Sequence, residues 1–248
     1  MKENFSSINK IARVGGVLYL VIIVAGIFGE LFVRGKLIVS GNAAATANNI
    51  MSCQLLWRAG IAGDLLMHVC DVPLVLIFYL LLKPVNKNLA LLALLFVLIQ
   101  TAVLIATKLN LFVPLFLMSN ADYLKAFEPQ QLQALSYIAI RLDGYGFGIG
   151  LIFFGCACLV IGYLITRSGY LPRLIGVLMQ IGGLCYLINS FALILAPEVA
   201  DILFPAIMLP SFIAELSFCM WLIVKGVNIP RWNEKQIQLV NEAYADRT

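Results

Sequence analysis

The chain has 248 residues, of which 62% are hydrophobic and only 12% are charged. About a quarter of the residues in soluble domains carry a charge, so this composition excludes an ordinary soluble protein and indicates an integral membrane protein. The formal net charge is +4, but the basic residues cluster at the ends of apolar runs and form no stripe with interleaved aromatics. We therefore expect no nucleic-acid partner.

Apolar runs set the expected architecture. A helix needs about 20 apolar residues to cross the hydrocarbon core of a bilayer, and six stretches of this chain qualify. They predict an all-α fold, a bundle of six transmembrane helices within one domain over residues 1–227. In the segment 228–248, Ile237, Val240 and Tyr244 fall on one side and Trp232 near the headgroups, which predicts an amphipathic cytoplasmic tail on the membrane surface. In chain order the six spans are expected at 13–33, 56–82, 89–112, 131–165, 172–195 and 203–224.

Lysines and arginines predict the orientation, because loops rich in them stay in the cytoplasm. With the N-terminus inside, eleven of the 17 basic residues fall in inner segments and three in outer segments, and the other three lie within or at the edges of spans. Both termini are therefore expected in the cytoplasm, with membrane lipid around the helices. The three outer residues are Arg34, Lys36 and Lys125.

The second span carries the most informative polar residues. Asp64, His68 and Asp71 stand in the run "DLLMHVCD", which holds the only histidine of the chain. At 100° per residue the three side chains fall within about 60° of one another on a helix. Counting 1.5 Å per residue from Leu82 places Asp71 near the middle of the membrane and Asp64 near its outer boundary.

Other charges within the spans also lie at mid-depth or further out. Glu215 falls near the middle of the sixth span, whereas Arg58, Arg141 and Asp143 fall near outer ends. Charges at these depths usually face a bundle interior or a watered cavity. We therefore expect an outward-facing polar pocket that binds or conducts a proton, a small cation or an amine-like ligand. Its expected residues are Asp64, His68, Asp71, Glu215, Arg58, Arg141 and Asp143.

Within that pocket, Asp71 and Glu215 are the expected proton- or cation-binding carboxylates. Asp64 and His68 would line the entrance, and Arg58 or Arg141 would balance the charge. Residues near the outer boundary, including Lys108 and Glu30, have the alternative reading of anchors that reach the headgroups.

Two other functional classes remain open. One is a membrane-embedded hydrolase that uses Asp64, His68 and Asp71 around a metal ion or an activated water. The other is a structural or assembly factor without a ligand. We expect no metal site and no cofactor, since the chain has one histidine, no H-E-x-x-H motif and no nucleotide-binding loop.

Several segments resemble a known family. They are "LLKPVNKNLALLA" (81–93), "ADYLKAFEPQQLQAL" (121–135) and "GYLITRSGYLPRLIGVL" (162–178), with "TANNI" and "RAGIAGDLL" before them. These segments are similar to a bacterial membrane family catalogued as domain of unknown function 4386. The resemblance implies a multi-pass protein of the bacterial inner membrane and brings no activity. It also implies histidines in the fourth span, near Asp143 and after Gly155, where this chain has Cys156, Ala157 and Cys158.

Overall fold

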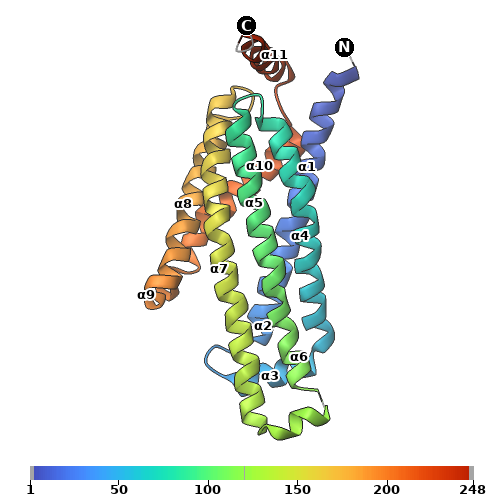
Figure 1. Cartoon of the computed structure of the whole chain (residues 1–248), viewed down its shortest axis with the longest axis vertical. Coiled ribbons are helices and arrows are strands. Elements are labelled where there is room, and N and C mark those ends of the chain that lie inside the picture. Colours follow the sequence, from blue (N-terminus) through green and yellow to red (C-terminus); the bar gives the residue numbers. More distant parts are fainter. Residues whose placement is uncertain (1–2, 120, 246–248) are drawn as a thin grey trace.

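The computed structural model describes residues 3–119 and 121–245, and every regular element among them is helical (Figure 1). The all-α bundle expected from the sequence is confirmed. The elements are α1 (Glu3–Ile27), η1 (Phe28–Arg34), α2 (Gly35–Leu37), α3 (Ala43–Ser52), α4 (Gln54–Leu82), α5 (Lys87–Thr107), η2 (Lys108–Phe112), α6 (Val113–Leu117), η3 (Asp122–Ala126), α7 (Pro129–Ser168), α8 (Arg173–Leu195), α9 (Pro197–Leu203), η4 (Ala206–Met208), α10 (Leu209–Val224) and α11 (Ile229–Ala245).

Six helical stretches of the described chain are long and apolar enough to cross a membrane, and they correspond to the six predicted spans. Three of them combine several elements: α1 continues through η1 into α2, α5 continues through η2 into α6, and η4 leads into α10. The observed stretches are Ile8–Leu37, Gln54–Leu82, Lys87–Leu117, Pro129–Ser168, Arg173–Leu195 and Ala206–Val224. The first, third and fourth are longer at both ends than the predicted spans.

The helices differ in length, so some of them extend beyond the others at one end of the bundle. At 1.5 Å per residue the 40 residues of α7 extend about 60 Å, whereas the 23 residues of α8 extend about 35 Å. Both begin or end near α11, so α7 continues well past the far end of α8 (Figure 1). We call the two ends of the molecule the α11 end and the α3 end. Among the six stretches of the described chain, Arg173–Leu195 with 23 residues and Ala206–Val224 with 19 residues have the length of a typical bilayer crossing.

Small residues let α7 and α8 pack closely. A Cβ atom on Gly162 would lie 2.5 Å from the carbonyl oxygen of Gly176, and one on Gly155 would lie 2.9 Å from that of Gly183. Inside a membrane the hydrophobic effect contributes little to helix association, because lipid tails are as apolar as the side chains. Close backbone contact of this kind is therefore a main source of the association. This interface holds α8 against the upper part of α7 in Figure 1.

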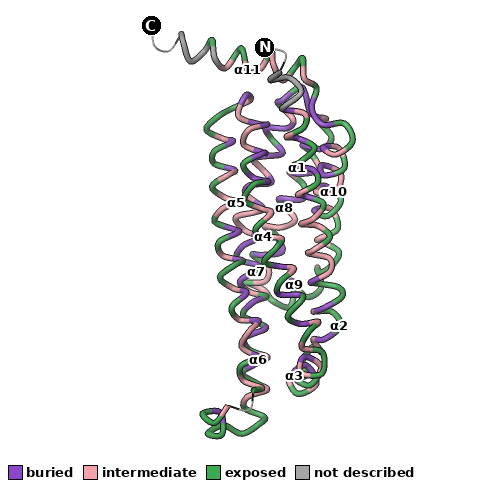
Figure 2. The backbone as a smooth tube through the Cα atoms, turned by 90° about the vertical axis from the view of Figure 1, so that its right-hand side faces the viewer, coloured by how far each residue is buried: buried purple, intermediate pink, exposed green. Residues whose placement is uncertain are grey.

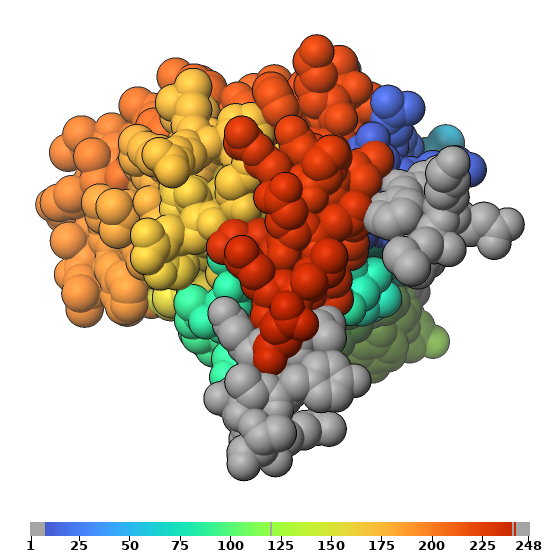
Figure 3. Space-filling view, turned by 90° about the horizontal axis from the view of Figure 1, so that it is seen from above, coloured from blue at the N-terminus to red at the C-terminus, as the bar shows by residue number. Residues whose placement is uncertain are grey.

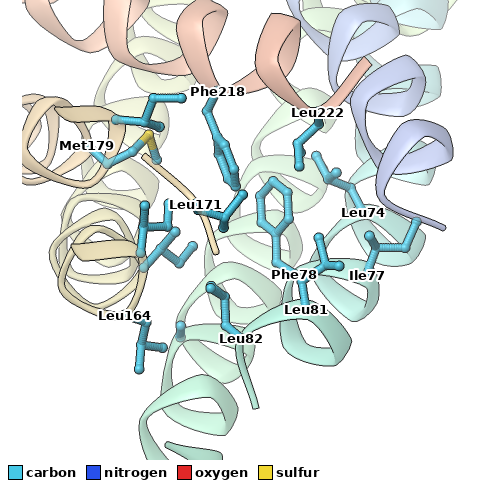
Figure 4. Packing of buried hydrophobic residues seen from close by; sticks show 14 of the residues in the cluster. Leu74, Ile77, Phe78, Leu81, Leu82, Leu164, Leu171, Met179, Phe218 and Leu222 are labelled. Atoms are coloured by element: carbon cyan, nitrogen blue, oxygen red, sulfur yellow. The ribbon is translucent and has the colours of Figure 1, made fainter. Parts of the chain in front are cut away.

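A large apolar core occupies the α11 end. Phe78 of α4 and Phe218 of α10 lie with ring centroids 5.1 Å apart (Figure 4). The ring of Tyr19 stands edge-on to both. A second, smaller core occupies the α3 end around the fully buried Trp57. Figure 2 shows buried residues along the inner faces of the helices, with exposed residues on the outside. The polar groups described below lie between the two cores.

The α11 end is closed by hydrogen bonds to the last turn of α4. The hydroxyl of Tyr170 donates to the carbonyl oxygen of Leu81 at 2.6 Å, and the indole nitrogen of Trp232 donates to the same oxygen at 3.2 Å. These donors satisfy a carbonyl that has no partner within the helix. Burial raises the pKa of Tyr170, which keeps the hydroxyl protonated as a donor. The contact also ties α11, within the predicted tail 228–248, to the bundle, although residues 246–248 lie outside the described chain.

Candidate functional site

One face of α4 turns its polar residues into the bundle. Asp64 and His68 are each 1% exposed, and the side chain of Asp71 is 13% exposed. Their neighbours Leu65, Leu66 and others on the opposite face are exposed to the surroundings. The helical period thus separates a polar inner face from an apolar outer face. The three residues do not share one set of contacts, however, and they divide into two groups.

Asp64 belongs to an ionic network at the level where α8 ends. Arg34 binds it with two hydrogen bonds, from Nη1 to Oδ2 at 2.7 Å and from Nη2 to Oδ1 at 3.3 Å. Lys108 Nζ lies 3.4 Å from Asp64 Oδ2 and donates to both carboxylate oxygens of Asp143 at 3.1 Å. Glu30 accepts from Arg34 Nε at 2.8 Å on the more exposed side. We call Glu30, Arg34, Asp64, Lys108 and Asp143 the ionic network.

The π-helical segment η1 brings Arg34 to Asp64. Its wider turn follows α1 directly and carries Glu30 and Arg34 one turn apart, so the two form an ion pair along the helix. Gly29 permits the close approach, because a Cβ atom there would lie 2.6 Å from Asp64 Oδ1 and 2.9 Å from Arg34 Nη2. π-helical turns are rare and occur frequently at functional sites. Here the turn positions a guanidinium between two carboxylates.

The depth of this network follows from the packing of α7 on α8. Gly148 contacts Leu193 in the last turns of α8. Asp143 precedes Gly148 by five residues in α7, on the side of the α3 end. Five residues extend a helix by about 7.5 Å, so Asp143 lies beyond α8 toward the α3 end. A bilayer matched to α8 would therefore have the ionic network at its boundary, where charged groups cost less than at the centre.

His68 and Asp71 form a second group, deeper in the bundle. His68 Nδ1 lies 3.1 Å from Asp71 Oδ2, which also accepts a longer hydrogen bond of 3.4 Å from the Thr101 hydroxyl. The other ring nitrogen of His68, Nε2, is buried and has no hydrogen-bond partner among the described residues. Because most buried polar atoms are paired, an unpaired imidazole nitrogen calls for an explanation. When Nδ1 donates to Asp71, Nε2 of a neutral ring is a free acceptor.

Glu215 lies in a third environment, made of aromatic residues. The Tyr186 hydroxyl donates to Glu215 Oε1, and Tyr19 lies beside the same carboxyl group. The ring of Tyr186 in turn packs on that of Phe154, with centroids 5.5 Å apart. Within the described chain Glu215 makes no ion pair. No hydrogen bond joins it to Asp71 in the described chain.

The remaining expected residues lie apart from these groups. Arg58 and Arg141, expected to balance the buried acids, are both exposed and make no ion pair with any residue that the structure describes. Arg34 and Lys108 balance the charge instead. Sequence reasoning assigned Arg34 to an outer loop and gave Lys108 the role of an anchor. The four-residue spacing of Glu30 and Arg34 was the one available signal for the first ion pair.

The acidic residues next to the cations are arranged as ion pairs. In the described part of the chain no group of three or more His, Cys, Asp or Glu side chains is placed to hold a metal ion. Asp64 is paired with two cations, Arg34 and Lys108. A gap between Arg34, Trp57 and Leu111 is too narrow for a water molecule. The groups with unused capacity are His68 Nε2, Asp71 and Glu215, and each is chemically suited to take up a proton.

Comparison with known proteins places the chain among proteins without an assigned activity. A family model described as "Domain of unknown function (DUF4386)" matches residues 14–226. An uncharacterized protein of Archaeoglobus fulgidus is 28% identical over 166 residues, which cover 67% of this chain and 83% of that protein. No solved structure matches.

Proposed function

The chain belongs to the DUF4386 family, a domain of unknown function, and on that premise we propose that it binds a proton or a small cation inside its bundle, reached from the α3 end. The observation that carries the proposal is the buried His68 and Asp71 pair, with Nε2 of His68 unpartnered. A group that exchanges protons is the simplest use of a buried imidazole next to a carboxylate. The binding residues are Asp71, His68 and Glu215.

A path along α4 supports entry from the α3 end. Asp64 and His68 lie one helical turn apart, and Asp71 follows less than one turn later, so the three span about 10 Å along the helix. A proton that enters past the ionic network would bind first to His68 and then to Asp71. Glu215 of α10, whose carboxyl group accepts a hydrogen bond from the Tyr186 hydroxyl, is the proposed inner acceptor.

Close packing favours a proton over a larger ligand. The gap between Arg34, Trp57 and Leu111 admits no water molecule, so this gap offers no room for an amine-bearing ligand. A proton needs only groups within hydrogen-bonding reach, such as the 3.1 Å contact between His68 and Asp71. Binding of a small cation or an amine is tested separately from proton binding.

The experiment compares proton uptake by purified protein between about pH 5 and 8, a range around the ordinary pKa of free histidine. Asp71→Asn and Glu215→Gln should remain folded and should each take up fewer protons than the wild type. Asp122→Asn is the matched control, because that carboxylate is 91% exposed at the α3 end, and it should leave uptake in this window unchanged. Equal uptake by wild type, Asp71→Asn and Glu215→Gln would refute proton binding.

A second set of measurements addresses cations and amines. Thermal unfolding is followed with sodium, potassium, methylammonium or choline chloride at constant ionic strength. Stabilisation by one small cation, lost in Asp71→Asn and kept in Asp122→Asn, would assign the site to that cation. Stabilisation by none of them, together with altered proton uptake, assigns it to the proton alone.

We also propose that the α3 end faces outward from a bacterial inner membrane and that both termini are cytoplasmic, on the strength of the basic residues near the α11 end. In a cysteine-free background, single cysteines at Ala44 and Asp122 should react with an impermeant reagent added outside. Cysteines at Asn86 and Asn228 should react only after lysis. All four positions are exposed, so burial does not block the reagent. Outside labelling at Asn86 reverses the orientation.

One observation favours a structural role for part of the site. Asp64 and Asp143 are buried and already paired with Arg34 and Lys108, which leaves them no free capacity. These residues act as a clamp between η1, α4, η2 and α7. If the uptake experiment finds no change in either variant, this structural role extends to the whole polar face of α4.

A further inference from the structure

A recess at the α11 end has a different character from the polar face of α4. It has a volume of about 380 Å³ and lies where the α4–α5 turn, the end of α7, the start of α8 and α11 meet. Figure 3 looks onto this end, with α11 in red beside the end of α7 in yellow. The volume is within the range of small-ligand sites, roughly 300–1,000 Å³. The recess is therefore large enough for a headgroup-sized ligand.

Three cations line the recess: Arg167 of α7, Arg173 of α8 and Lys235 of α11. No acidic side chain is among its lining residues. In the part of the chain that the structure describes, none of the three cations makes an ion pair. This contrasts with Arg34 and Lys108, whose charges are compensated by buried carboxylates. The recess thus holds an uncompensated positive charge.

Local geometry orients the side chain of Arg167 and places Arg173 at a helix N-terminus. The guanidinium of Arg167 stands over the ring of Tyr163, 5.9 Å from its centroid, which orients it by a cation–π contact. Arg173 is the first residue of α8, and the preceding Pro172 offers no side-chain cap to the first backbone N–H groups. The positive end of the α8 dipole therefore adds to the charge at the edge of the recess.

An apolar stripe begins at the same edge. Leu174, Val177, Ile181, Leu184 and Ile188 are all between 44% and 69% exposed on α8. Their spacing of three to four residues puts them on one face of the helix, which runs from the recess into the membrane span. A charged recess above an apolar stripe matches a phospholipid, with a phosphate group at one end and acyl chains at the other.

We propose that this recess binds the phosphate group of an anionic phospholipid, with Arg167, Arg173 and Lys235 contacting the phosphate and the acyl chains lying along α8. The site is separate from the buried carboxylates and does not depend on the proposed proton binding. Arginine and lysine are the usual ligands of lipid phosphates, and each contributes to binding near a membrane surface. Because α11 supplies Lys235, the bound headgroup also holds this helix against the bundle.

The test measures thermal unfolding and bound lipid, by native mass spectrometry, for the full chain in detergent. Phosphatidylglycerol should raise the melting temperature of the wild type, and phosphatidylcholine should do so much less. The variant Arg167→Gln/Arg173→Gln/Lys235→Gln should bind phosphatidylglycerol about a hundredfold more weakly. The single change Lys235→Gln, on the peripheral helix, should weaken binding about fivefold and serves if the triple variant does not fold.

The matched control is Lys10→Gln/Arg13→Gln/Lys225→Gln, which removes the same charge from exposed positions at the same end but outside the recess. It should keep the affinity of the wild type. Inorganic phosphate and glycerol 3-phosphate form a further arm. Stabilisation by these soluble anions that is lost in the recess variant assigns the site to free phosphate compounds. Equal losses in the recess and control variants, or equal effects of the two lipids, would overturn the proposal.

Discussion

The ionic network and the deeper carboxylates, Asp71 and Glu215, differ in the groups that compensate a buried acid. Asp64 and Asp143 are buried, and two cations at distances of 2.7 to 3.4 Å compensate them. Asp71 and Glu215 meet a histidine and neutral hydroxyl groups instead. A carboxylate held by a cation keeps its charge, whereas a carboxylate among neutral donors is free to exchange a proton. The first group is arranged as fixed ion pairs, and the second is the group that we propose to bind a proton.

Position in the membrane explains why the two groups differ. The ionic network lies past the end of α8, near the expected boundary of the bilayer, where charged side chains are least costly. Glu215 lies within the span of α10, and a permanent cation beside it would itself need to be buried. Tyrosine hydroxyls give the carboxyl group a partner without adding a charge. The α10 environment therefore suits a group that is neutral part of the time.

The largest effect should come from breaking the ionic network at its centre. Lys108→Met leaves Asp143 buried without a cation and removes one partner of Asp64, so the free energy of unfolding should fall by about 3–5 kcal/mol. The measurement is denaturant or thermal unfolding in detergent at pH 7. The double variant Lys108→Met/Asp143→Leu removes both charges and should recover much of the loss. A Lys108→Met protein as stable as the wild type would show that the network is not a clamp.

A smaller effect should come from the Tyr186 and Glu215 pair. Tyr186→Phe removes the hydroxyl that donates to Glu215, and the free energy of unfolding should fall by about 1–3 kcal/mol. In a Glu215→Gln background the same change should cost less. The difference, obtained from a double-mutant cycle, is the coupling energy of the pair.

Repeating this cycle at pH 5 and pH 8 sharpens the comparison. Hydrogen bonds to charged groups are worth more than those to neutral ones, so the coupling should be larger at pH 8, when more of the carboxyl group is ionised. The corresponding cycle for Lys108 and Asp143 should depend less on pH over this range. A coupling for Tyr186 and Glu215 that is the same at both pH values would argue against proton exchange at Glu215.

The smallest effects should come from the exposed arginines. Arg58→Gln and Arg141→Gln alter residues that contact no acid in the described chain, so each should change the free energy of unfolding by no more than about 0.5 kcal/mol. The same unfolding measurement applies, with Lys108→Met as the positive reference. A loss of several kcal/mol in either variant would place that arginine in the charge balance after all.

The sequence alone was sufficient for the six spans and for the polar face of α4, because both depend on local patterns. Hydropathy over about 20 residues identifies a membrane crossing, and the 3.6-residue period puts Asp64, His68 and Asp71 on one face. The resemblance of three polar loop segments also predicted the family that the family model identifies over residues 14–226.

Tertiary structure decided the partners of those residues. Arg34 meets Asp64 across 30 positions, Lys108 meets Asp143 across 35, and Tyr186 meets Glu215 across 29. Such pairs depend on helix rotation, on the π-helical turn at η1 and on the glycines that set how closely helices approach. None of these is a property of a single segment. The sequence therefore suggested Arg58 and Arg141 as the compensating cations, whereas the structure pairs Arg34 and Lys108 with the buried acids. The basic recess likewise exists only where four segments meet, because α7, α8 and α11 supply one cation each and the α4–α5 turn supplies none.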